Sequence, residues 1–113
     1  MSEQVSNIDF VVVESGPSLS EVIEAVARIT DAPIRGDHLD LPDPRAGVLV
    51  VERAQRIIVR VYYAGDVEPR QTLSRRIYDG LAETTDWDLT LDSDDAEDVI
   101  ASRSVRAPGQ PAR

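Results

Sequence analysis

The stretch that decides the fold is residues 8–30, IDFVVVESGPSLSEVIEAVARIT, in which a strand pattern gives way to a helix pattern. Its first part, Ile8–Val13, is apolar and β-branched except for Asp9, which is typical of a central strand covered on both faces. A glycine–proline pair then ends the strand. Ser18 and Glu21 have the spacing of a capping box, and apolar residues recur at helical spacing after them. We therefore expect a strand followed by a helix that ends before the next proline.

Two further β-rich runs, Val48–Val51 and Ile57–Tyr63, flank a short polar turn and predict a hairpin. The second run alternates, so that three side chains share one partly wet face (Ile58, Arg60 and Tyr62). The proline-rich segment between Ile34 and Gly47 could add a short edge strand.

A second helix is predicted to begin after Gly65 and to fade near Thr84, because its apolar residues repeat every four positions (Leu73, Ile77 and Leu81). Over residues 87–92, apolar and polar side chains alternate strictly, which predicts a half-buried strand with its acids pointing outward. A final helical turn is expected through residues 99–100.

The resulting order is strand, helix, strand, strand, helix, strand. Two split strand–helix–strand units predict an α+β fold, a ferredoxin-like split β-α-β sandwich with an antiparallel sheet of four or five strands and two helices on one face. The first and third strands would be central, and the last would lie at an edge. At 113 residues the chain makes one domain, expected over residues 1–102, and residues 103–113 are expected to form a flexible tail.

The net negative charge is concentrated in one quarter of the chain. Between Ile77 and Ser102 there are nine acids and no lysine or arginine, whereas elsewhere twelve acids face twelve arginines. The formal net charge of −9 therefore belongs to this window. A local field of that sign attracts a basic surface and repels the phosphates of nucleic acid. We expect a basic protein partner and no nucleic acid.

Acids also crowd the carboxyl end of the predicted second helix, where the helix dipole disfavours them, while Arg70 occupies its first turn. Residues that break a stability rule in this way often serve a function. The predicted partner-binding residues are therefore Asp79, Glu83, Asp86, Asp88, Asp92, Asp94 and Asp95. Trp87 and Tyr62 are candidate aromatic anchors, although the alternation favours a core position for Trp87. The alternative explanation is that charges on an edge strand only prevent aggregation.

Catalysis has little support in the residues. The chain lacks cysteine and lysine, and its one histidine, His38, lies in a Pro/Gly-rich stretch outside any catalytic motif. No glycine-rich phosphate loop occurs, and the acids from Asp86 onward do not match the glycine and glutamate positions of an EF-hand. We therefore predict no enzymatic activity, no catalytic residues, no metal and no cofactor.

The location of the protein is predicted from two features of the sequence. The amino-terminal residues are polar and lack the pattern of a signal peptide, and no apolar run approaches the roughly 20 residues that span a bilayer. These features favour a cytoplasmic protein with no membrane contact, present as a monomer or a homodimer.

In size, charge and its acidic segment at residues 86–92 (DWDLTLD), the chain resembles the small acidic immunity proteins that neutralise bacterial polymorphic or contact-dependent toxins. This resemblance implies an antitoxin that blocks a basic toxin, often a nuclease, by placing carboxylates in its phosphate-binding cleft. A second resemblance, to ACT regulatory domains, rests on the turn around Gly16 and Pro17. It implies a sensor that binds a small molecule near Gly16.

Overall fold

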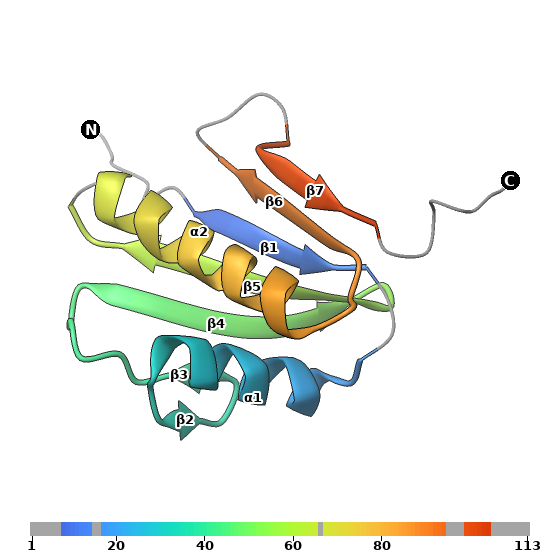
Figure 1. Cartoon of the computed structure of the whole chain (residues 1–113). Coiled ribbons are helices and arrows are strands. Elements are labelled where there is room, and N and C mark those ends of the chain that lie inside the picture. Colours follow the sequence, from blue (N-terminus) through green and yellow to red (C-terminus); the bar gives the residue numbers. More distant parts are fainter. Residues whose placement is uncertain (1–7, 15–16, 66, 95–98, 105–113) are drawn as a thin grey trace, which may run out of the picture.

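The computed structural model describes residues 8–14, 17–65, 67–94 and 99–104, and within these ranges it contains one antiparallel sheet of seven strands and two helices. The elements are β1 (Asp9–Val13), α1 (Leu19–Thr30), β2 (Ile34–Arg35), β3 (His38–Leu39), β4 (Ala46–Arg53), β5 (Arg56–Tyr63), α2 (Val67–Thr84), β6 (Leu89–Ser93) and β7 (Ala101–Arg103). The strand order is β2-β3-β4-β5-β1-β6-β7. Both helices lie on the same face of the sheet (Figure 1). The predicted α+β class is confirmed.

Helix α1 forms as its sequence predicts. The Ser18 hydroxyl accepts a hydrogen bond from the Glu21 N–H at 3.2 Å, and the Glu21 carboxylate accepts one from the Ser18 N–H at 2.8 Å. These two bonds satisfy amide groups that have no partner inside the helix. Asp31 ends the helix in the left-handed conformation, with a φ of 55°, and its N–H donates to the Ala27 carbonyl.

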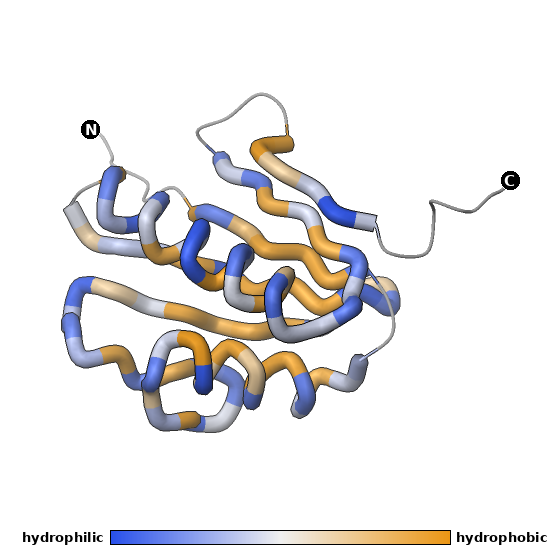
Figure 2. The backbone as a smooth tube through the Cα atoms, in the orientation of Figure 1, coloured by the Kyte–Doolittle hydropathy of each residue, from blue (hydrophilic) through white to orange (hydrophobic). Residues whose placement is uncertain are grey.

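The hairpin of β4 and β5 is also confirmed. Ala54 and Gln55 connect the strands, and both have positive φ (53° and 68°), as a turn that follows the right-handed strand twist requires. The helix-facing side of β5 is buried, and the other side is half-buried or exposed, as the alternation predicts. Figure 2 shows hydrophobic residues running along β1, β4, β5 and α1, where the core lies between the helices and the sheet.

Helices cover only one face of the sheet, so the prediction that the first strand is covered on both faces is wrong. Val11 and Val13 are buried against the helix layer, whereas Phe10 and Val12 are half-buried on the other side. The connection from β1 to β4 contains α1, and the connection from β5 to β6 contains α2. The two connections start from antiparallel strands and cross the sheet in opposite directions. Because connections of this kind are right-handed, both helices lie on the same side of the sheet. We call the side opposite the helices the open face.

The sheet has more strands than the four or five expected, and two short segments account for the difference. The segment after α1 forms β2 and β3, while β7 pairs with β6 on the opposite side of the sheet. Thus β6 is not an edge strand. The predicted helical turn through residues 99–100 is wrong, because the Ile100 N–H donates to the Leu91 carbonyl at 2.8 Å as the chain enters β7. A strand of three residues is too short to leave a period in the sequence.

The last described strand reaches the residue at which the tail was expected to begin. Arg103, where the tail was expected to begin, is the last residue of β7, and residues 105–113 lie outside the described ranges. Neither helix within those ranges has the length and apolar character needed to cross a bilayer.

Candidate functional site

A buried polar network holds α2 against the sheet. Asp9 is fully buried in β1, and its carboxylate accepts hydrogen bonds from Arg70 Nε at 3.0 Å, Ser74 Oγ at 2.7 Å and Ser93 Oγ at 2.6 Å. Arg70, only 3% exposed, comes from the first turns of α2, so the ion pair joins the helix to the central strand. The sequence showed one acid in an apolar strand, and a buried charge of this kind requires a charged or hydrogen-bonding partner. Sequence analysis did not identify Arg70 as that partner.

The carboxyl end of α2 receives a cation from β7. The Arg103 guanidinium donates hydrogen bonds to the carbonyls of Ala82, Thr85 and Trp87. A guanidinium in this position binds carbonyls that have no partner in the helix and opposes the negative end of the helix dipole. The helix therefore does have a compensating charge, although it has no basic residue in its own last turn. Because Arg103 comes from β7, a view of the helix residues alone did not include this cation.

The predicted partner-binding acids do not form one surface. Asp79, on the outer side of α2, is paired with Arg75 at 3.2 Å, in an i,i+4 ion pair. Asp92 points from β6 to the open face, where its carboxylate accepts the Ser93 N–H at 2.8 Å. At the far end of β6, the Asp94 carboxylate accepts the Ile8 N–H at 3.1 Å. Asp95 lies outside the described residues.

Two of these acids remain together at the carboxyl end of α2. Glu83 and Asp86 are exposed, and neither has a hydrogen-bond or ion-pair partner among the residues that the structure describes. Asp88 follows them and is half-buried. Trp87 is partly buried against the core, so only part of its ring is available to a partner. We call Glu83, Asp86 and the last turn of α2 the acidic end.

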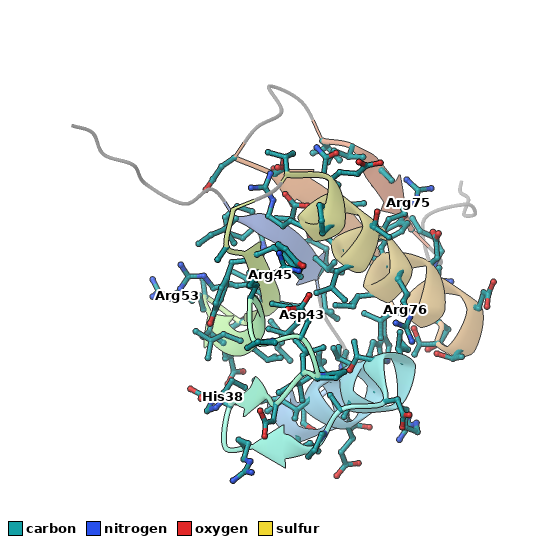
Figure 3. The ribbon with its side chains drawn as sticks, turned by 90° about the vertical axis from the view of Figure 1, so that its left-hand side faces the viewer. His38, Asp43, Arg45, Arg53, Arg75 and Arg76 are labelled. Atoms are coloured by element: carbon teal, nitrogen blue, oxygen red, sulfur yellow. The ribbon has the colours of Figure 1, made fainter. Side chains whose placement is uncertain are left out.

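The open face carries a different set of groups. Arg53 and Arg60 line a cavity of roughly 200 Å³ together with Phe10, Val51 and Ile58. Within the described ranges neither arginine has an ion-pair partner, in contrast to Arg56, which lies 3.1 Å from Glu14. Figure 3 shows Arg53 projecting from the side of the sheet away from the helices. The alternation of β5 and the predicted placement of both helices on one face of the sheet both indicated this partly wet face (Figure 1).

Tyr62, the second predicted aromatic anchor, also lies on the open face. Its side chain is 38% exposed, and its ring lies directly over Gly47 of the neighbouring strand. A Cβ atom at Gly47 would be 2.2 Å from a ring carbon, so only glycine allows the ring to lie there. This packing fixes the ring and leaves its outer side available.

A third group of polar residues lies at the start of β4. The Tyr63 hydroxyl donates to the Asp43 carboxylate at 2.5 Å, and the guanidinium of Arg45 lies 5.1 Å from the centre of the Tyr63 ring. The Tyr63 hydrogen bond, followed by the Arg45 N–H, lowers the pKa of Asp43 below its ordinary value. These groups bind one another and stabilise the loop before β4.

The remaining residues considered for catalysis, metal binding or ligand binding belong to none of these groups. His38 is exposed on β3, with its Nδ1 atom 3.6 Å from Asp37 Oδ1. Among the described residues, no three histidine, aspartate or glutamate side chains are grouped to hold a metal ion. Gly16, near which a small-molecule sensor would bind its ligand, lies outside the described ranges.

Searches against protein-family models, curated proteins and solved structures found no match to this chain. The acidic end and the open face are therefore the two surfaces from which a function can be inferred.

Proposed function

We propose that the protein is a non-enzymatic binding protein, an immunity protein (antitoxin) that neutralises a basic toxin, such as a nuclease, through its acidic end. One observation carries this proposal. Glu83 and Asp86 are exposed together beside a helix carboxyl terminus, and no cation among the described side chains pairs with either carboxylate.

Three other carboxylates among the described residues have their charge opposed locally. Asp40, Asp79 and Glu14 each lie within 3.3 Å of an arginine nitrogen. A carboxylate that is already paired gains less from a basic partner than an unpaired one does. The unpaired charges of the acidic end therefore suit rapid, salt-sensitive association with a basic surface, at up to about 10⁸–10⁹ M⁻¹s⁻¹ at low salt.

Fewer acids support this proposal than the sequence alone suggested. Glu83 and Asp86 are its centre, with Asp88 and the exposed part of Trp87 beside them, whereas Asp79, Asp92 and Asp94 have other neighbours. The proposal includes a cytoplasmic location, because a nuclease toxin would meet its nucleic acid substrate there.

Affinity capture and a growth assay test this function together. The tagged protein would be used to capture partners from a lysate of its source organism at low salt, followed by release in a salt gradient. The most strongly retained basic protein would then be expressed in a bacterial host, alone and together with this chain. We expect growth arrest by the captured protein alone and normal growth when both proteins are present.

Two double variants with the same net charge test whether the rescue of growth depends on the acidic end. Glu83→Gln with Asp86→Asn should abolish the rescue of growth, whereas Glu68→Gln with Asp37→Asn should preserve it. Glu68 lies at the opposite end of α2, and Asp37 lies between β2 and β3. A captured protein that is harmless to the host, or rescue that survives the first double variant, would contradict the proposal.

The finer fold assignment belongs to the same proposal. The inner strands follow the order β4-β5-β1-β6, with a helix in each of the two connections that join parallel strands, and this order supports a ferredoxin-like sandwich. In this description β2, β3 and β7 are additions at the two edges.

A further inference from the structure

The open face combines apolar side chains with charges of both signs. Its half-buried apolar residues come from three neighbouring strands and are Phe10, Val12, Leu49, Val51 and Ile58. The exposed Tyr62 adds a further aromatic ring. No described helix covers these residues (Figure 1). An apolar sheet face of this kind usually packs against another layer.

Two charges of this face are placed symmetrically about β1. Arg60 on β5 and Asp92 on β6 are both directly opposite Phe10 in the register of the sheet, one on each side. Adjacent strands lie about 4.8 Å apart, so the backbones of Arg60 and Asp92 are about 10 Å apart. Arg60 has no ion-pair partner among the described residues, and Asp92 accepts only a backbone N–H.

We propose that a second copy of this chain covers the open face, forming a face-to-face homodimer with its two-fold axis along β1. That rotation places Phe10 against Phe10 of the second copy. It also places Arg60 of each copy opposite Asp92 of the other, because the two residues lie at equal distances on either side of the axis. At this row of residues the interface is therefore apolar at its centre and self-complementary in charge on both sides, as an isologous contact requires.

A second copy suits the face better than an unrelated protein. A partner must present a negative charge opposite Arg60 and a positive charge opposite Asp92, separated by an apolar group. This chain presents that pattern itself. The open face also contributes Arg53 and Arg60 in a protein whose net charge is −9, so it is a surface on which two copies can approach.

The size of the face sets the concentration at which the dimer should be sought. Seven strands spaced about 4.8 Å apart, with about five residues of 3.4 Å each, give a face of roughly 500 Å². Stable complexes bury about 800 Å² on each partner. We therefore expect a weak dimer with a dissociation constant in the micromolar range. Sedimentation velocity at protein concentrations from about 1 to 300 μM covers this range.

Charge reversal gives a test whose expected result an unfolded variant would not produce. Arg60→Asp alone and Asp92→Arg alone each place two pairs of like charges in the interface, which should weaken self-association at least tenfold. A mixture of the two variants restores both attractive pairs, so it should form a heterodimer of about the wild-type affinity. Arg28→Asp, which makes the same charge change on the exposed side of α1, should leave the dimer intact.

Each outcome of the sedimentation experiment either supports or overturns the homodimer. A mass that rises from 12.4 kDa towards twice that value in the wild-type chain, lost in each single variant and regained on mixing, supports the dimer. A wild-type chain that stays monomeric over the whole range overturns it and leaves the face to another segment of the chain or another protein. Dimerisation that persists in the single variants, or that does not return in the mixture, also overturns it. The acidic end lies outside this interface, so this result is independent of toxin binding.

Discussion

At the scale of single residues, Asp9 determines how α2 is held on the sheet. Its carboxylate has Arg70, Ser74 and Ser93 as partners in a site with almost no solvent. We expect Asp9→Asn to lower the free energy of unfolding by about 3–5 kcal/mol, because it leaves the Arg70 charge buried without a counter-ion. Adding Arg70→Met should recover most of that loss, since no buried charge then remains.

Urea unfolding of the two single variants and the double variant measures this coupling. Asp40→Asn is the matched control, because Asp40 and Arg35 form an exposed ion pair, and its cost should stay below about 1 kcal/mol. Equal effects of Asp9→Asn and Asp40→Asn would show that the buried pair is not coupled to folding as we describe.

Tyr63 controls the ionisation of Asp43. The hydrogen bond from the tyrosine hydroxyl is the largest cause of the lowered pKa of Asp43. Ionised Asp43 therefore stabilises the fold above its ordinary pKa of 3.8, and this contribution is lost as the pH falls through the lower pKa of the folded state. We expect Tyr63→Phe to raise the pKa of Asp43 towards 3.8, measured by NMR titration of the carboxyl carbon. Tyr62→Phe, on the other face of the sheet, should leave it unchanged, and an equal change in both variants would argue against this cause.

At the scale of elements, α2 depends on β7 for its carboxyl-terminal cap. Arg103 binds the carbonyls of Ala82, Thr85 and Trp87, and hydrogen bonds to a charged group contribute about 1.5–3 kcal/mol each. We expect Arg103→Met to lower the free energy of unfolding by at least about 1.5 kcal/mol. Amide hydrogen exchange should speed up in the last turn of α2 and in β7.

Arg28→Met provides the comparison for this variant, because Arg28 is exposed on α1 and has no described partner. Its amide exchange and stability should match the wild type. If Arg103→Met also leaves exchange at the end of α2 unchanged, the cap does not have the role that its contacts indicate.

The long elements could be predicted from the sequence, but the short ones could not. Both helices and the hairpin have enough residues for a period, a cap or a turn to be recognised, and they lie where expected. β2, β3 and β7 have two or three residues each, and only pairing with neighbouring strands makes them strands. The same limit applies to the site, because Arg70, Arg103 and Arg60 acquire different roles from contacts with distant parts of the chain.

At the scale of the whole molecule, charge is divided between surfaces that face different ways. The open face carries Arg53 and Arg60, and the acidic end carries Glu83 and Asp86. The segment of nine acids in the sequence suggested a single acidic surface. Those that lie in the described residues are instead distributed over the outer side of α2, the open face and both ends of β6. If both proposals hold, a homodimer would present two acidic ends and could bind two basic partners.

The most direct test of the central claim is the salt dependence of binding to the captured basic partner, measured by isothermal titration calorimetry from about 50 to 500 mM salt. At low salt, Glu83→Gln with Asp86→Asn should weaken the wild-type affinity about tenfold and reduce the slope of log Kd against log salt. Glu68→Gln with Asp37→Asn should reproduce the wild-type affinity and slope. Equal affinity and slope in the wild type and in the Glu83/Asp86 variant would contradict binding through the acidic end.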